Sequence, residues 1–326
     1  MRIAVIGAGL SGLVAARSLQ QDHDVSVFEK SRGVGGRMAT RYQGGFEFDH
    51  GAQFFTARSA EFQDFLQPLL QRGVFASWRA RFAELDRGAI TATRAWGADY
   101  PHFVGVPGMN AVGKFLGEGL SVCRNTRVTQ LESYKKGWQL RDDGGSDLGR
   151  FDWVILALPA AQTRALAPAD SNLRDVCDSA PMKSCFAVML GFEEPLQLPW
   201  DAALVRGADI SWVSVNSSKP GRPDAFTLVV HSTNAYADAH IDNDIEAVKS
   251  HLLAEIAEIV GEKNGSAVFQ QLQRWRYANA DRRDGPGFFI DEDLRLAACG
   301  DWFIRGRVEA AFSSAFSLTQ LLRARL

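Results

Sequence analysis

Three glycines near the start of the chain have the spacing of a phosphate-binding turn. Gly7, Gly9 and Gly12 form a G-x-G-x-x-G pattern directly after the apolar run Ile3 to Ile6. Gly7 allows a tight turn, Gly9 lets the backbone approach a diphosphate, and Gly12 lets the next helix pack closely on the strand. Free N–H groups at the start of that helix favour negative charge. The pattern therefore indicates binding of the diphosphate of a dinucleotide.

An acidic residue and a second glycine loop indicate which dinucleotide is bound. Glu29 ends the apolar run Val25 to Phe28, about 20 residues after the glycines, where a carboxylate accepts hydrogen bonds from a ribose diol. The loop from Lys30 to Arg37 then holds several cations and glycines. Because FAD binds in an extended form, such a loop can contact the far side of its diphosphate, with Arg37 as a two-pronged donor. The sequence thus favours FAD, although Lys30 is also compatible with solvated surface charge.

The C-terminal part supplies further candidate contacts. The apolar run Leu296 to Cys299 ends in Gly300-Asp301, so Asp301 is expected to accept hydrogen bonds from the ribityl hydroxyls. A helix that opens at Gly306-Arg307 and runs to Arg325 is predicted, and its first N–H groups would favour the negative charge that gathers on a reduced flavin.

Two other segments complete the predicted cofactor site. Gln53 and Phe54 follow a turn at Gly51 and are expected to reach the ribityl or ring system, although Phe54 equally fits core packing. Val128 is expected to contact the adenine through its backbone. The predicted cofactor-binding residues are Gly7, Gly9, Leu10, Ser11, Gly12, Glu29, Lys30, Gly36, Arg37, Gln53, Phe54, Val128, Asp301, Arg307 and Val308.

Substrate-facing residues are less well marked, and no acid–base pair is recognisable, so no catalytic side chain is assigned. Trp302 and Ile304 follow the Gly-Asp turn, and His231 ends an apolar strand, where a structural histidine is equally compatible. The candidates are Arg94, Cys185, His231, Trp302 and Ile304.

Composition sets the broad class. The chain has 326 residues, 46% hydrophobic and 23% charged, as in a soluble globular protein with two lobes. A net charge of −2 argues against a nucleic-acid or membrane partner, and no apolar run is long enough to span a bilayer. The four cysteines and six histidines lack metal-ligand spacing, so no metal is expected. The first strand begins at Arg2, which leaves no room for a leader and predicts a cytoplasmic protein.

The hydrophobic patterns predict two interleaved lobes. Residues 1-56, 105-165 and 266-326 are expected to form a Rossmann-like FAD-binding lobe of the α/β class. Residues 57-104 and 166-265 are expected to form a smaller α+β substrate lobe on a mixed or antiparallel sheet. Helical spacing covers Ala60 to Gly73 and Asp244 to Val260, the latter as a helix covering the core.

The motifs together resemble a known family. The two glycine loops, Gly51-Ala52-Gln53-Phe54-Phe55-Thr56, Pro107-Gly108-Met109 and Cys299-Gly300-Asp301-Trp302 with Gly306-Arg307-Val308-Glu309 resemble the FAD-dependent amine oxidase superfamily, and within it the renalase branch. The resemblance implies bound FAD, a flavin N5 that accepts hydride, and reoxidation by O₂ to give H₂O₂. Renalases oxidise the 2- and 6-dihydro isomers of NAD(P)H, whereas other members oxidise amines.

One departure from the amine-oxidase pattern favours the dihydronicotinamide substrate. Members that oxidise amines commonly hold the amine between aromatic rings, one of them following the glycine that opens the last helix, and here that residue is Arg307. A dihydropyridine needs no strong base, because hydride loss gives a stable aromatic cation. No cysteine lies between Gln270 and Ala298, so FAD is expected to be non-covalent. Two alternatives are an oxidase of primary or secondary amines and a redox-silent flavin-binding scaffold.

Overall fold

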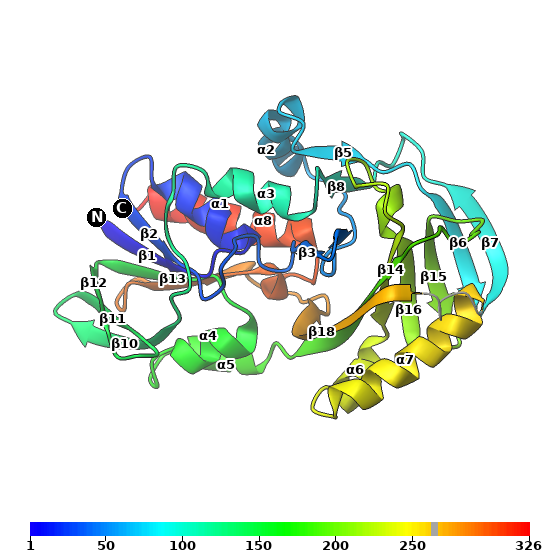
Figure 1. Cartoon of the computed structure of the whole chain (residues 1–326). Coiled ribbons are helices and arrows are strands. Elements are labelled where there is room, and N and C mark those ends of the chain that lie inside the picture. Colours follow the sequence, from blue (N-terminus) through cyan, green and yellow to red (C-terminus); the bar gives the residue numbers. More distant parts are fainter. Residues whose placement is uncertain (262–266) are drawn as a thin grey trace.

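A six-stranded sheet forms the centre of the first lobe (Figure 1). The computed structural model describes residues 1–261 and 267–326. The strand order is β19-β20-β13-β1-β2-β9, with parallel pairing from β20 to β9 and an antiparallel edge at β19. The strands are β1 (Arg2–Ile6), β2 (Asp24–Phe28), β9 (Ser121–Cys123), β13 (Trp153–Leu156), β19 (Phe288–Asp291) and β20 (Leu296–Cys299).

Side chains alternate across this sheet, so both of its faces are covered. Ile3 and Val5 belong to the core shared with α1 (Leu10–Leu19), α3 (Asn110–Gly117) and α8 (Val308–Arg323). Ala4 and Ile6 point to the other face, into a separate core. That core is covered by β10 (Val128–Tyr134), β11 (Gly137–Asp142), β12 (Asp147–Phe151), α4 (Ala160–Leu166) and α5 (Leu173–Asp178).

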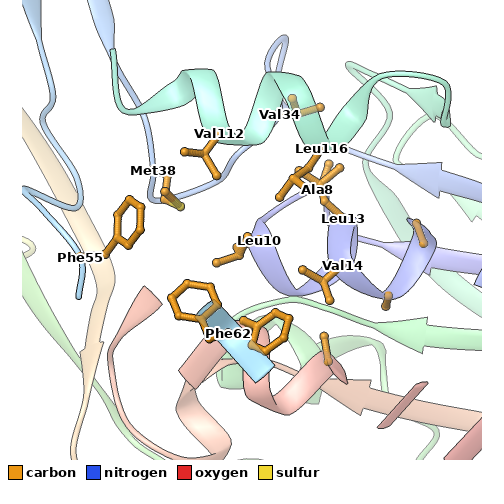
Figure 2. Close-up of a cluster of buried hydrophobic side chains, with 14 of the residues drawn as sticks. Ala8, Leu10, Leu13, Val14, Val34, Met38, Phe55, Phe62, Val112 and Leu116 are labelled. Atoms are coloured by element: carbon orange, nitrogen blue, oxygen red, sulfur yellow. The ribbon is translucent and has the colours of Figure 1, made fainter. Parts of the chain in front are cut away.

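The helical face is packed closely around α1. Figure 2 shows Leu10 and Leu13 of this helix on the side of Val112 and Leu116 of α3, with Val14 in the same core on the side of α1 away from α3. All five side chains are buried. Burying aliphatic side chains of this size contributes about 1.5–3 kcal/mol each. This packing fixes the direction of α1, and so fixes where its N-terminal N–H groups point.

A seven-stranded sheet forms the second lobe, with the order β18-β14-β17-β16-β15-β6-β7. Its pairs are antiparallel except for the parallel pair β15–β6. Helices α6 (Asn234–His240) and α7 (Ile245–Val260) lie along its outer side (Figure 1). The strands are β6 (Arg81–Asp86), β7 (Ala89–Ala95), β14 (Met182–Phe192), β15 (Ala202–Arg206), β16 (Ile210–Val215), β17 (Thr227–Ser232) and β18 (Ala267–Ala280). Two small hairpins pair β3 (Arg41–Gln43) with β4 (Phe46–Phe48), and β5 (Phe75–Ser77) with β8 (Phe103–Gly105).

The predicted fold class is confirmed: a Rossmann-like α/β lobe is interleaved with a lobe built on a mixed sheet. The predicted helix Asp244 to Val260 covers the core, with Val248, Leu252 and Ile256 buried. Strand β7 was not predicted, because all its side chains are exposed and give no apolar alternation. In the part of the chain that is described, no helix combines the length and apolar character needed to cross a membrane.

The predicted domain boundaries stay a prediction, and two elements suggest changes to them. Helix α2 (Ala60–Gln71) lies in the segment expected in the substrate lobe, yet its Phe62 ring is 5.0 Å from Phe312 of α8. Strand β18 follows the boundary expected at residues 265 and 266, yet it pairs with β14 of the seven-stranded sheet. That boundary itself falls outside the described residues. We propose that α2 belongs with the first lobe and β18 with the second.

Helix α3 offers a test of how the second glycine loop is held. A Cβ added at Gly113 would lie 2.5 Å from the Cα of Gly35, whereas one at Gly117 would make an ordinary 3.5 Å contact with Val34. Gly113→Ala is therefore expected to lower the free energy of unfolding by about 1–3 kcal/mol. The control Gly117→Ala, in the same helix, should be neutral or stabilising by up to about 1 kcal/mol. Urea unfolding measures both; equal effects would contradict the close approach of this helix to the loop.

Candidate functional site

A cavity of about 1530 Å³ lies between the two lobes. It exceeds the usual 300–1,000 Å³ of a single-ligand pocket, so it has room for a large cofactor and a second molecule. Its walls come from both glycine loops, residues 50–56, β10, β18 and the start of α8. The N-terminal glycine loops and the start of the C-terminal helix, which were predicted to bind one ligand, therefore line the same cavity.

The first glycine loop has the expected form. Gly7 has φ of +105°, and its N–H donates to the carbonyl of Phe28 at 2.8 Å. A Cβ at Gly9 would meet no protein atom within 4 Å, and Gly9 lines the cavity, so its backbone is open to a ligand. Gly12 does not line the cavity; a Cβ there would lie 1.9 Å from the Gly7 carbonyl oxygen. Gly12 therefore serves the close helix packing predicted for it and does not itself face the cavity, whereas Leu10 and Ser11 do.

Glu29 is buried at the end of β2 and faces the cavity. Its two carboxylate oxygens accept the N–H of Ala8 at 2.9 Å and the N–H of Ser31 at 2.8 Å. A carboxylate has about four acceptor positions, so two remain for ligand hydroxyls. Glu29 thus ties the two glycine loops together and can still bind a diol.

Arg37 is held by the C-terminal turn, which corrects its predicted role. Its guanidinium donates to both oxygens of Asp301, at 2.8 Å and 2.5 Å, and to the carbonyl of Ala278 at 2.9 Å. The two prongs expected to clamp a diphosphate are therefore used by a carboxylate, which explains why Asp301 is almost fully buried. This pair joins the second glycine loop to a turn 264 residues away. Both residues still line the cavity, together with Lys30 and Gly36.

The remaining predicted cofactor residues also line the cavity. Val128 begins β10, the edge strand of the three-stranded sheet, so one side of its backbone has no neighbouring strand in that sheet. Gln53, Arg307 and Val308 reach the same space. Phe54 lines the cavity as well, while its ring packs 5.0 Å from that of Trp96; its contact with a cofactor stays a prediction.

Two of the five substrate-facing candidates line the cavity, Cys185 and His231. Trp302 does not; it is fully buried in the core beneath the sheet and donates to the carbonyl of Leu158 at 2.9 Å. Ile304 packs against that same core. Arg94 is exposed on β7 and pairs with Glu84 at 3.1 Å. The last three predictions are wrong because sequence proximity to a turn, or membership of a lobe, does not fix the face on which a side chain lies.

A buried ion cluster next to the cavity was missed by the sequence analysis. The side chains of Asp49, Lys219 and Arg222 are at most 1% exposed. Asp49 accepts from Arg222, from Lys219 at 3.4 Å and from the N–H of Met109 at 2.9 Å. Burial raises the pKa of the Asp49 carboxyl, but Lys219 and Arg222 outweigh this and leave the pKa below its usual value. The sequence Ser-Lys-Pro-Gly-Arg did not predict that these two cations are buried, because two cations beside Pro-Gly are typical of an exposed turn.

Two histidines in the cavity wall are held neutral. The His50 ring stacks on Trp275 at 5.2 Å, and its Nδ1 is buried with no partner among the described residues. Burial, then the charge of Arg41, lowers the pKa of His50 to about 4. Burial and the charge of Lys219 lower the pKa of His231 to about 4, although part of the His231 ring faces the cavity.

The cavity wall is strongly cationic. Of the residues that the structure describes, eleven Lys and Arg line it against three acidic residues. The acidic residues are already engaged: Glu29 by backbone N–H groups, Asp301 by Arg37, and Glu309 by the N–H groups of Arg58 and Ser59. The cations are Lys30, Arg32, Arg37, Arg41, Arg58, Lys114, Arg127, Arg274, Arg276, Arg305 and Arg307. This charge suits anionic ligands such as diphosphates.

The residues present fit an extended dinucleotide. Bare backbone at Gly9, a carboxylate with free acceptor positions at Glu29, and an edge strand at Val128 all line the cavity. A glycine with open space beside it is what a close approach of diphosphate to the backbone requires.

Family models match most of the chain. Residues 5–69 match the model described as an NAD(P)-binding Rossmann-like domain. Residues 58–316 match the model described as a flavin containing amine oxidoreductase.

One kind of relative matches a short segment in sequence, and another matches the whole chain in structure. The 4,4'-diapophytoene desaturase of Staphylococcus aureus strain Newman is 42% identical over 78 residues, which span 21% of this chain but 16% of the desaturase. A candidate protoporphyrinogen oxidase from Exiguobacterium sp. 255-15 superimposes with a TM-score of 0.80 at 13% identity, covering 100% of this chain and 99% of the other. Wild-type putrescine oxidase bound to putrescine gives 0.70 at 16% identity, covering 100% of both chains. These two structures show that the fold is shared.

Acid should destabilise the protein through the histidines of the cavity wall. The folded-state pKa of His50 is below its ordinary value of 6.5, so the unfolded chain binds the proton first as the pH falls. Stability should drop between about pH 6.5 and pH 4, with His50 accounting for about 3 kcal/mol. Thermal unfolding of wild type and His50→Gln across this range measures it. His240→Gln, outside the cavity, is the control; identical pH profiles for His50→Gln and wild type would contradict the assignment.

Proposed function

Since the chain belongs to the flavin-containing amine oxidoreductase family, we propose that it is an FAD-dependent oxidase of dihydronicotinamides. The proposed substrates are the 2- and 6-dihydro isomers of NAD(P)H, which a renalase-like member of this family would oxidise to NAD(P)⁺. The bound flavin supplies the hydride acceptor, N5, and O₂ takes up the electrons to give H₂O₂.

The observation that carries the proposal is the charge of the cavity wall. A dinucleotide substrate brings a second diphosphate to a space where cationic side chains greatly outnumber acidic ones. Arg58, Arg305 and Arg307 line the wall without an ion pair to an acidic side chain among the described residues. These arginines are suited to bind phosphate oxygens through paired N–H donors. An ammonium ion would be repelled by the same wall.

The chain's own residues are proposed to position the reactants rather than to move protons. Glu29 and the two glycine loops hold the cofactor, and Gln53, Cys185 and His231 lie in the wall facing the second lobe. His231 and His50 remain neutral at physiological pH, so neither adds a charge near the pyridinium that hydride loss leaves. Correct placement of the two reactants can account for much of the rate.

The cofactor is proposed to be non-covalent. Cys185 is the cysteine of the described residues that lines the cavity, and burial raises the pKa of its thiol to about 12. A thiol with so high a pKa is a poor nucleophile toward a flavin. Cys177, Cys185 and Cys299 are buried and free, which also supports the proposed cytoplasmic location, because cytoplasmic thiols stay reduced.

An amine oxidase is the second candidate, and aromatic rings in the wall favour it. Phe54, Tyr100, Trp275 and Tyr277 all line the cavity, and aromatic faces attract ammonium groups. The strong excess of arginine in the wall argues against this candidate.

Anaerobic reduction of the flavin distinguishes the two functions. We expect stopped-flow mixing with 2- or 6-dihydroNAD(P) to bleach the flavin absorbance, while putrescine and other primary amines leave it unchanged. The 4-dihydro isomer and free FAD are the controls. Bleaching by amines alone would establish the second candidate, and no bleaching faster than that of free FAD would favour a redox-silent scaffold.

Removing the Glu29 carboxylate tests the cofactor site. Glu29→Ala should weaken FAD binding by about 1.5–3 kcal/mol, because a charged acceptor for the ribose diol is lost. Asp24→Ala is the matched control, since Asp24 is an exposed acid at the other end of the same strand. Flavin content after gel filtration and FAD titration of the apoprotein measure the change. Full flavin retention by Glu29→Ala would exclude the proposed contact.

A further inference from the structure

A second, smaller cavity lies beside the first. Its volume is about 490 Å³, which is within the usual range for one small ligand. Thr56, Arg58 and Tyr100 line both cavities, so the two spaces adjoin at these residues. The proposed function uses the large cavity for a cofactor and a reacting ring, and it leaves the smaller cavity without a ligand.

The smaller cavity is built on one face of α2. Gln63, Leu66, Gln67 and Leu70 line it, and their spacing of three and four residues puts them on the same side of the helix. Helix α2 contacts β5, and β5 pairs with β8, so these three elements form its walls together with the loop before β8 (Figure 1). The rest of the lining comes from residues 56–58, 75, 99–101 and 103.

The inner part of this cavity is apolar and aromatic. Leu66 and Phe75 are at most 4% exposed, and the ring of Phe103 meets that of Phe75 edge to face, with the ring centroids 5.1 Å apart. At the mouth, Leu70 and Tyr100 are 46% and 49% exposed. Exposed apolar side chains that gather at a concave surface are typical of a ligand-binding groove. A flat ring bound here would cover them.

Polar groups in the same lining suit the edge of a purine. Among the described residues, the side-chain amide of Gln67 has no hydrogen-bond partner, and that of Gln63 donates to the carbonyl of Ala57 at 3.1 Å. A glutamine amide can donate to N7 of adenine and accept from its 6-amino group. Asp99 has no ion pair in the described part of the chain, and its carboxylate can accept ribose hydroxyls.

Arg58 lies where the two cavities adjoin and supplies a charge for a phosphate. Its guanidinium lies over the ring of Tyr100, 5.3 Å from the centroid, and has no ion pair among the described residues. The backbone N–H groups of Arg58 and Ser59 donate to Glu309 in the first turn of α8, which holds this segment in place. A guanidinium at this position can bind phosphates that link a group in one cavity to a group in the other.

We propose that the smaller cavity binds the adenosine half of the dinucleotide substrate, with Arg58 on the phosphates between the two halves. The adenine lies against Leu70 and Phe103, and the Gln67 amide contacts its edge. This inference rests on the proposed function, which puts the nicotinamide half in the large cavity. It gives the substrate an adenosine site of its own, separate from the one expected for the cofactor at Val128.

Binding of AMP to the FAD-loaded protein tests this cavity without using activity. The cofactor fills its own adenosine site there, so bound AMP reports a second site. In isothermal titration calorimetry, Gln67→Ala and Leu70→Ala should each weaken AMP binding by about three- to tenfold, through a lost hydrogen bond and a lost apolar contact respectively. The matched control is Gln71→Ala, because Gln71 ends the same helix but does not line the cavity. It should bind AMP as wild type does.

The three substituted side chains are exposed, so the variants should fold. Failure of the wild-type protein to bind AMP would overturn the proposal. Equal effects of Gln67→Ala and Gln71→Ala would overturn it as well.

Two further ligands test the base and the phosphate separately. UMP carries the same phosphate on a smaller base, so wild type should bind it at least about threefold more weakly than AMP. Equal binding of UMP and AMP would contradict adenine recognition. Wild type should also bind AMP about tenfold more tightly than adenosine, and Arg58→Gln should remove this difference, because the charged hydrogen bonds to the phosphate are lost. A difference that persists in Arg58→Gln would exclude the role of Arg58.

Substrates with and without the adenosine half separate this inference from the proposed function. Flavin reduction by 2- or 6-dihydroNAD is compared with reduction by the matching dihydronicotinamide mononucleotide in wild type and Gln67→Ala. The preference for the dinucleotide should fall by about three- to tenfold in Gln67→Ala. An unchanged preference would overturn the inference and leave the proposed function standing. If AMP binds as expected but no dihydronicotinamide reduces the flavin, the proposed function fails and the adenosine site stands.

Discussion

The hydrogen bonds and ion pairs of the Asp49 carboxylate hold the two lobes in their relative position. It lies just after β4, and its partners come from the second lobe through Lys219 and Arg222, from the turn before α3 through the N–H of Met109, and from the hydroxyl of Thr40. A carboxylate removed from water is stable only when such partners surround it. The segment leading to Gln53 is therefore bound to both lobes. This also fixes the position of the cavity wall formed by residues 50–56.

The sequence predicts the nucleotide lobe better than the second lobe for a physical reason. Gly7, Gly9 and Glu29 act through backbone geometry and one carboxylate at a strand end, and these requirements are local in the chain. Arg37 was placed correctly at the cavity, but its partner Asp301 is 264 residues away, and no local pattern shows that the two pair. Lys219 and Arg222 were overlooked because burial of a charge depends on the tertiary fold. Trp302 was misplaced because the turn after β20 directs it beneath the sheet.

The balance of charge around the cavity is arranged in two layers. Among the described residues, Arg58, Arg305 and Arg307 line the wall without an acidic partner, while Lys219 lies behind the Gln53 amide and does not line the cavity. A wall of this kind can bind a polyanion and still present neutral groups to a flat aromatic ring.

Strand β18 pairs with β14 from Met182 to Phe192, and its residues 273–279 line the cavity. Successive side chains on a strand point to opposite faces, so Gln273 and Trp275 share one face, and a register shift in the pairing with β14 interrupts the alternation beyond Trp275. A single strand of the second sheet thus carries much of the wall opposite the glycine loops, on a backbone held by its pairing with β14 on both sides of that shift. Over evolutionary time, substitutions at these alternating positions could redirect the enzyme to new substrates while the nucleotide lobe is left unchanged.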